Sequence, residues 1–394
     1  MPTDSVSPTG SPISTGSPIS TGSPISTGSP ISTTALARLR LVAQGLVPGD
    51  SLPPPLRMSP DPVSAVRRMT ALQSQDLPAG MLAVGVRADG ATASGVAAAL
   101  ASGAVVRTWT MRGTLFLVLA EDVRTYVKLA SARVMRSAAS RHRGLGIAEE
   151  DVAVVRKVAE ERLGGGNGLT RAELFDAFQA AGQPTGGQRG IHLLSILSHR
   201  LVLVQGPLRG RQQEFRLAEE WLPPGEGLAG DDALEYLAGR YVASHGPVDE
   251  RDFAWWIGQP LGSVRGPFRA AAAKVVAVEN EGRVLFCTPE VASLLDSRAG
   301  ARTAVALPGY DELALGYPDR SVAIPAPYLE RLIPGVNGVF KAMLSFGGRA
   351  VGTWLKEGTP AAPRVRPELF EELPPAAADA MARAVARIEK YWAG

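Results

Sequence analysis

Two glutamines, Gln73 and Gln75, stand two positions apart shortly before Pro78. A carboxamide is not a competent base, but its oxygen can accept a hydrogen bond from a water molecule and orient it, and its dipole can face a developing positive charge. Because the residue before a proline is disfavoured in the α region, the pattern predicts a helix over residues 62–75 that ends here. Two side chains at such an end could reach one cleft, although an ordinary polar helix end is the alternative.

A second stretch, from Arg107 to Leu115, predicts two short strands around a turn at Gly113. Trp109, Met111 and Leu115 follow the alternation of a strand with one apolar face, while the arginines of this stretch remain polar. The pattern is typical of a basic β-hairpin.

One order of elements recurs three times along the chain: helices followed by a two-stranded hairpin, which is the winged-helix pattern. We therefore predict an α+β protein with winged-helix units at residues 34–125, 126–225 and 226–300, and a β-rich segment with a terminal helix at 301–394. Within this scheme, Thr170 and Glu173 form a capping box, and acidic residues begin the helix at 249–257.

The expected helices are 34–44, 62–75, 93–102, 149–163, 170–181, 189–199, 233–245, 249–257, 261–273 and 374–392. The expected strands and hairpins are 81–86, 107–119, 201–217, 275–287, 303–307, 338–345 and 350–356.

The first 33 residues differ from the rest, because Gly-Ser-Pro-Ile-Ser-Thr recurs in tandem from Gly10 without a charged residue. Such a segment cannot bury enough apolar surface to offset its ordering entropy, so we expect residues 1–33 to be disordered. The repeat could be a ligand for another molecule, but expansion of a tail is the simpler interpretation.

Composition limits the classes of function. The 394 residues carry 41 Lys and Arg against 38 Asp and Glu, so the net charge of +3 does not by itself indicate nucleic acid. A single cysteine, Cys287, excludes an internal disulfide framework and a Cys-rich zinc site, and it suits a reducing cytoplasm. The histidines lack ligand spacing, nucleotide-phosphate motifs are missing, and no apolar run reaches the length of about 18 residues that a membrane helix needs. We therefore expect no cofactor, no metal and no membrane partner.

Repeated winged helices make double-stranded DNA the first partner to consider, because a recognition helix fits the major groove and a basic wing follows the backbone. Winged helices also bind proteins, and the basic run at 133–143 could equally be a solvated helix face. The residues expected to contact DNA are Arg107, Arg112, Thr114, Arg133, Arg136, Arg141, Arg143, Arg209 and Arg211.

Four motifs in order resemble those of the AlkZ/YcaQ family of winged-helix DNA glycosylases, and together they extend over most of the chain beyond residue 34. They are Leu-Gln-Ser-Gln at 72–75, the hairpin at 107–115, Leu-Pro-Gly-Tyr-Asp-Glu with Leu-Gly-Tyr-Pro-Asp-Arg at 307–320, and Asn-Gly-Val-Phe at 337–340 with Gly-Thr-Trp at 352–354. The resemblance implies a C-shaped protein around a DNA channel that excises alkylated purines, in some members including interstrand crosslinks as self-resistance to alkylating antibiotics.

The resemblance also implies that Gln73 and Gln75 match the Gln-Φ-Gln catalytic motif of the AlkZ-like branch. Ser74 stands where that motif has an apolar residue, and Phe116 stands where a histidine is expected. In this scheme Gln75 holds the attacking water and Gln73 assists it or contacts the sugar. Asp76 is the nearest carboxylate, and Asp311 is a second candidate that could instead form a structural ion pair with Arg320.

The preferred hypothesis is a monomeric, monofunctional DNA glycosylase for purines alkylated at N7 or N3. Such a base is cationic and is already a good leaving group, so its release needs little acid catalysis. The alternatives are a non-catalytic winged-helix DNA-binding protein and a protein-interaction scaffold. The scaffold leaves Arg133–Arg143 and Arg209 with Arg211 unexplained.

Overall fold

The computed structural model describes residues 25–26, 30–273, 275–335, 338–359 and 362–394. The predicted disorder of residues 1–33 falls mostly outside these ranges. Within them, Ile25–Ser26 form a short strand, β1, which pairs in parallel with β8 (Val276–Asn280). Helix α1 (Thr33–Ala43) begins after Ser32, whose side chain accepts a hydrogen bond from the Ala35 N–H.

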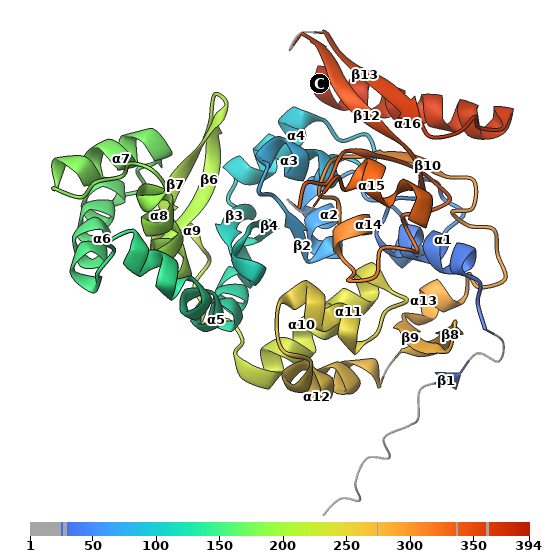
Figure 1. Ribbon diagram of the computed structural model, residues 1–394, viewed down its shortest axis with the longest axis horizontal. Helices are drawn as coiled ribbons and strands as arrows, with labels where there is room; N and C mark the ends of the chain where they lie inside the picture. Colours follow the sequence, from blue (N-terminus) through green and yellow to red (C-terminus); the bar gives the residue numbers. More distant parts are fainter. Residues whose placement is uncertain (1–24, 27–29, 274, 336–337, 360–361) are drawn as a thin grey trace, which may run out of the picture.

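A six-stranded sheet connects the centre of the molecule to the lobe at the left of Figure 1, in the order β2-β4-β3-β6-β7-β5. Both predicted hairpins at 107–119 and 201–217 are confirmed. They are joined side by side, because Arg107 in β3 pairs with Gln205 in β6. The strands are β2 (Ala71–Gln73), β3 (Val105–Trp109), β4 (Leu115–Leu119), β5 (Leu169–Thr170), β6 (Leu203–Arg209) and β7 (Gln212–Leu217).

Three helices, α6 (Glu149–Leu163), α7 (Arg171–Ala180) and α8 (Arg189–His199), build the left-hand lobe around β6 and β7 (Figure 1). The capping box predicted for α7 is present, since the Thr170 N–H donates to the Glu173 carboxylate at 2.7 Å and the Thr170 hydroxyl accepts from the Glu173 N–H. The long helix α5 (Val123–Gly144) connects this lobe to the rest of the chain.

The third group of predicted elements is also confirmed. Helices α10 (Gly230–His245), α11 (Glu250–Ile257) and α12 (Leu261–Ala272) precede the hairpin of β8 and β9 (Arg283–Cys287). Asp249 caps α11, because its carboxylate accepts hydrogen bonds from the N–H groups of Arg251 and Asp252.

The C-terminal segment contains a four-stranded antiparallel sheet and the terminal helix, at the upper right of Figure 1. The strands predicted at 303–307 and 350–356 and the terminal helix are confirmed. The strand predicted at 338–345 begins only at Met343, and the last strand was not predicted. The elements are β10 (Ala304–Leu307), β11 (Met343–Phe346), β12 (Arg349–Thr359), β13 (Ala362–Leu369) and α16 (Pro375–Ala393). The protein is thus a mixed α+β fold.

The segment that carries the two glutamines differs from the prediction. The helix expected over 62–75 ends at Met69, because Thr70 has a φ of 70°, and residues 71–73 form strand β2. The expected strand at 81–86 is wrong, since helix α3 (Leu77–Gly85) occupies it. Pro78 does not end a helix but lies in the first turn of one, where its missing N–H has no cost. Asp76 caps α3 by accepting from the Ala79 N–H at 3.0 Å.

The remaining helices are short or lie against the central core: α2 (Pro62–Met69), α4 (Ala93–Ala101), α9 (Ala218–Trp221), α13 (Pro289–Ala292), α14 (Glu312–Leu315) and α15 (Leu329–Leu332). None of the helices within the described ranges has the length and apolar character needed to cross a bilayer.

Candidate active site

The two glutamines lie where the terminal strand of the six-stranded sheet gives way to α3. Gln73 ends β2 opposite Phe116 of β4 and is half-buried. Its backbone N–H donates to a carboxylate oxygen of Glu312, whereas its carboxamide makes no hydrogen bond to any residue that the structure describes. Gln75 is exposed, and its Oε1 accepts from the Leu115 N–H at 3.3 Å. Gln73 therefore has its whole hydrogen-bonding capacity available, and Gln75 keeps part of its own.

Arg107 holds the segment between the glutamines. Its Nε donates to the Ser74 carbonyl at 2.8 Å and its Nη2 to the Gln75 carbonyl at 3.0 Å. Its Nη1 donates to Gln205 Oε1 at 2.7 Å, which ties the segment to β6. Burial lowers the pKa of Arg107 to about 10, so the side chain remains charged at neutral pH. This arginine was predicted to contact DNA, and in the structure its guanidinium donates to the backbone of the glutamine segment and to Gln205 and Gln213.

Ser74, between the glutamines, is fully buried and packs against Gly80 of α3. A methyl group on Gly80 would lie 2.4 Å from Ser74 Oγ, so strand and helix approach each other very closely here. The small serine side chain is therefore matched to the glycine opposite it.

Glu312 is the carboxylate beside Gln73, and it was not predicted. Its side chain is only 1% exposed; Oε1 accepts from the Gln73 N–H at 3.2 Å and Oε2 from the Trp256 indole at 3.1 Å. Nε2 of His245 lies 3.5 Å from Oε2, and burial lowers the pKa of that histidine. The Tyr-Asp-Glu motif contained the signal, but its preceding aspartate was chosen instead.

Asp311 itself has a structural role. It is 3% exposed, forms a two-point ion pair with the buried Arg87 at 2.7 and 2.8 Å, and caps α14 through the Leu313 N–H. The ion-pair alternative is therefore correct in kind, although the partner is Arg87 rather than Arg320. No hydrogen bond joins Asp311 to Gln73 in the part of the chain that the structure describes.

Arg112 lies beside Phe116, the residue that pairs with Gln73 across the sheet. The Arg112 guanidinium is 5.4 Å from the centroid of the Phe116 ring and donates to the Trp256 carbonyl at 3.2 Å. Phe116, which stands where a histidine was expected, is thus buried, and its ring makes a cation–π contact with Arg112. Thr114 is half-buried, and its hydroxyl lies 3.5 Å from the Met111 carbonyl.

A groove of about 830 Å³ opens beside Gln75, between α3, the β6–β7 hairpin and the ends of α7 and α8. Trp109 and Phe175 contribute apolar walls, and Arg171 and Arg211 contribute positive charge. Both arginines are exposed, and neither has a carboxylate partner among the residues that the structure describes. Arg171 was not predicted, although its position in the first turn of a helix next to the β6–β7 hairpin was a usable signal.

The other arginines that were predicted to contact DNA differ in whether their guanidinium groups already have partners within the protein. Arg133, Arg136 and Arg143 are exposed on α5 and lack carboxylate partners within the described ranges. Arg141 donates to Gln188 Oε1 at 2.6 Å. Arg209, at the tip of the hairpin, is committed to Glu173 at 2.7 Å and to Glu214 at 2.6 Å.

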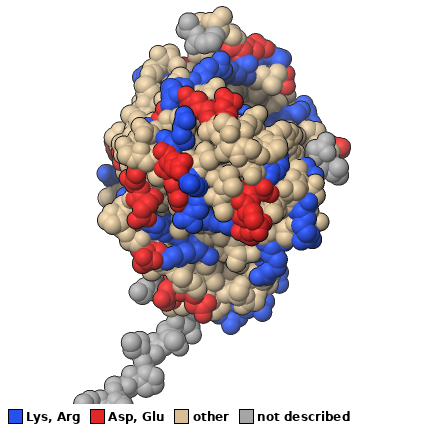
Figure 2. All heavy atoms as spheres, turned by 90° about the vertical axis from the view of Figure 1, so that its left-hand side faces the viewer, with Lys and Arg blue, Asp and Glu red and all other residues tan. Residues whose placement is uncertain are grey.

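Charge is mixed on the outer face of the left-hand lobe, where Figure 2 shows acidic and basic side chains in alternating groups. Within the described part of the chain, no group of three or more His, Cys, Asp or Glu residues could hold a metal ion.

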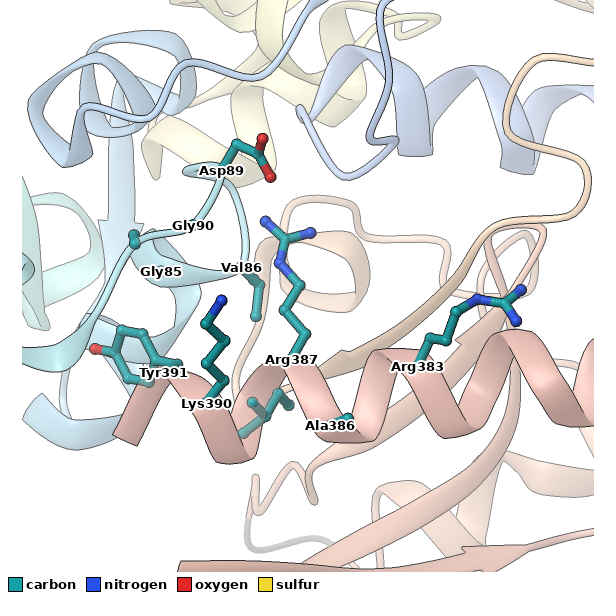
Figure 3. Close-up of a pocket in the computed structure, with 11 residues that line it drawn as sticks. Gly85, Val86, Asp89, Gly90, Arg383, Ala386, Arg387, Lys390 and Tyr391 are labelled. Atoms are coloured by element: carbon teal, nitrogen blue, oxygen red, sulfur yellow. The ribbon is translucent and has the colours of Figure 1, made fainter. Parts of the chain in front are cut away.

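A separate hollow of about 310 Å³ lies between the end of α3 and α16. Figure 3 shows the side chains of Arg387 and Lys390 extending from α16 toward the segment of Asp89, with Tyr391 turned toward Gly85. Arg387 donates to the Ala88 carbonyl at 3.2 Å. Neither glutamine lines this hollow, so it is not part of the candidate active site.

The family model for DNA glycosylase AlkZ-like proteins matches residues 66–391. A curated protein of Streptomyces sahachiroi, an interstrand DNA cross-link repair glycosylase, is 26% identical over 315 residues, which cover 76% of this chain and 83% of that protein. The solved structure of DNA glycosylase AlkZ from Streptomyces sahachiroi shares the fold, with a TM-score of 0.74, 23% identity and coverage of 92% of this chain and 97% of that chain.

The chain therefore belongs to the AlkZ-like DNA glycosylase family. It is a DNA glycosylase, a hydrolase of N-glycosyl bonds that acts in DNA repair, and DNA is its partner.

Proposed function

We propose that this protein hydrolyses the N-glycosidic bond of purines alkylated at N7 or N3. Such a base carries a positive charge, which weakens the bond to C1′ and makes the base leave without protonation. The enzyme then has two tasks: it must place a water molecule against C1′ and stabilise the positively charged sugar as it forms. Both tasks suit carboxamide groups, which orient water through the oxygen and present a negative dipole end to a cation.

The observation that carries the proposal is the Gln73 carboxamide, which makes no hydrogen bond to any described residue. A buried carboxylate holds the backbone of the same residue. Gln73 is fixed through its N–H to Glu312, and Gln75 is fixed through its carbonyl to Arg107. Neither anchor uses the Gln73 side chain. A rigid backbone with a free carboxamide is the arrangement that orients a water molecule at low entropic cost.

The width of the groove supports bulky adducts as substrates. Its volume of about 830 Å³ exceeds what a methylated purine needs, and its walls combine aromatic rings with free arginines. Together with the relative that is an interstrand DNA cross-link repair glycosylase, this supports a role in removing bulky adducts or crosslinks, including self-resistance to an alkylating agent.

DNA contact belongs to the same proposal. We assign it to Arg171 and Arg211 at the groove and to Arg133, Arg136 and Arg143 on α5, because all five are exposed and lack carboxylate partners in the described ranges. The protein would act as a monomer, with its three helix-and-hairpin groups as winged-helix units around the DNA.

The test is the release of base from a duplex with a single 7-methylguanine, and from a second duplex with a bulky N7 adduct. Abasic sites are detected by strand cleavage in alkali, and DNA binding is measured at matched salt. The Gln73→Ala/Gln75→Ala double variant is expected to lose at least about 100-fold in rate while it still binds DNA. Gln179→Ala removes an exposed carboxamide from α7 that does not line the groove, and it is expected to change the rate little.

Tight binding with no base release from either duplex would overturn the proposal in favour of a DNA-binding protein without catalysis. Release that survives the double substitution would instead place the catalytic groups elsewhere.

A further inference from the structure

Two adjacent tryptophans of α11 have opposite environments. Trp256 is fully buried and donates to Glu312, whereas Trp255 is 40% exposed. Trp255 is the only aromatic residue among the large hydrophobic side chains that the described part of the chain exposes. Its indole N–H donates to the Leu315 carbonyl at 3.3 Å, so the exposed ring is held in place. A fixed, exposed aromatic ring on a DNA-binding protein indicates a surface for stacking.

Positive charge flanks this ring. The guanidinium groups of Arg112 and Arg320 lie 5.9 and 5.6 Å from the Trp255 ring centroid. Each arginine also contacts a second ring, Arg112 over Phe116 and Arg320 over Phe340 at 5.2 Å. Arg320 makes no hydrogen bond through its Nε, which is buried without a partner among the described residues. Aromatic rings and guanidinium groups therefore alternate from the neighbour of Gln73 out to the surface.

A hollow of about 620 Å³ lies beside Trp255, between α5 and α11. Arg112, Arg133 and Gln259 contribute its polar groups. Gln259 donates through Nε2 to the Leu129 carbonyl at 2.8 Å, which orients the side chain and leaves its Oε1 free to accept. Arg133 is exposed and has no carboxylate partner within the described ranges. The volume lies within the range of about 300–1,000 Å³ that is usual for small-ligand pockets.

The hollow is distinct from the groove of Gln75, because the β3–β4 turn separates them. Arg112 and Gly113 of that turn line the hollow, while Trp109 and Leu115 of the flanking strands line the groove. A ligand in the hollow would therefore lie on the other side of the turn from Gln75.

We propose that this hollow binds an unpaired nucleotide of the DNA substrate, other than the nucleotide whose bond is cleaved. The base stacks on Trp255, the Arg133 guanidinium contacts its phosphate, and Gln259 Oε1 accepts a hydrogen bond from an exocyclic amino group. Removing a base from the duplex stack requires a new surface for the neighbours or partner that lose their stacking, and a fixed tryptophan supplies one. The inference rests on the proposed function for the role of the displaced nucleotide.

The test uses the full-length protein and two labelled duplexes, one fully paired and one with a single bulged nucleotide. Wild type is expected to bind the bulged duplex about fivefold or more tightly, the smallest effect expected of one stacked base. Trp255→Ala is expected to abolish this preference and Trp255→Phe to retain most of it. Val284→Ala removes a comparably exposed apolar side chain from β9, away from the hollow, and is the control for surface truncation.

A crosslinking experiment locates the base without any substitution. With 5-iodocytosine at the bulge, whose amino group can donate to Gln259 Oε1, irradiation of the wild-type complex is expected to attach the DNA to Trp255, identified by mass spectrometry. Equal affinity of wild type for both duplexes, or attachment to the peptides that carry Gln75 or Arg211 instead, would overturn the inference.

Neither readout requires catalysis, so the inference and the proposed function fail separately. Loss of base release with an intact bulge preference would count against the glycosylase substrate alone. Normal base release without the preference would count against the hollow alone.

Discussion

Replacement of Glu312 by glutamine tests how the active strand is positioned. The carboxylate accepts from two donors, the Gln73 N–H at 3.2 Å and the Trp256 indole at 3.1 Å. An amide has the same shape but one acceptor oxygen, so Glu312→Gln leaves one of these buried donors facing an NH₂ group. An unsatisfied buried group costs about 1–3 kcal/mol, and the lost bond was to a charged acceptor. We expect the free energy of unfolding to fall by about 2–3 kcal/mol, measured by urea denaturation.

The same substitution is expected to slow base release by at least about tenfold, because displacement of a positioned group by a fraction of an ångström weakens its effect on the reaction. Glu389→Gln is the matched control, since Glu389 also accepts from a backbone N–H, that of Val365 at 2.9 Å, far from the glutamines. The single amide oxygen of the variant can keep that bond, so Glu389→Gln is expected to change both the free energy of unfolding and the rate of release little. If Glu312→Gln lost stability but released base at the wild-type rate, Gln73 would not depend on this carboxylate.

Three further outcomes follow from the same contacts. Arg107→Lys loses the bonds to the Ser74 and Gln75 carbonyls together, so single-turnover base release is expected to fall about tenfold with a smaller loss of DNA affinity. Gly80→Ala places a methyl group 2.4 Å from Ser74 Oγ and is expected to lower the unfolding free energy by about 1–3 kcal/mol, as thermal denaturation would show. Burial lowers the pKa of His199 to about 4, so the unfolded chain, with a pKa near 6.5, takes up the proton first. Stability due to this residue is therefore full above pH 6.5 and is lost toward pH 4, and His199→Gln should flatten urea-denaturation stability across that window.

Local signals allowed most elements to be predicted from the sequence. The capping box of Thr170, the acidic cap at Asp249 and the apolar alternation in the hairpins are properties of a few neighbouring residues, and each corresponds to an observed element. These features are determined by residues that are close together in the sequence, so the residue pattern alone predicts them.

The errors concern features that depend on the rest of the fold. A proline after Gln75 was interpreted as a helix end, although the same residue suits a first helical turn, and the left-handed Thr70 that ends α2 has no sequence signal. The position of Glu312 behind Gln73 joins residues 239 positions apart, so it depends on tertiary packing rather than on any local pattern. The burial of Trp256 and the exposure of Trp255 likewise depend on how α11 packs against α14, which no local pattern states.

The measurement that tests the central claim most directly is the pH dependence of single-turnover base release from a 7-methylguanine duplex. Carboxamides do not titrate, and a cationic base needs no protonation. The rate is therefore expected to stay constant between about pH 6 and pH 8.5 in wild type. A sigmoidal or bell-shaped profile within this range that spontaneous base release from the same duplex does not share would show that a titrating group of the protein takes part, and it would contradict the assignment of the reaction to Gln73 and Gln75.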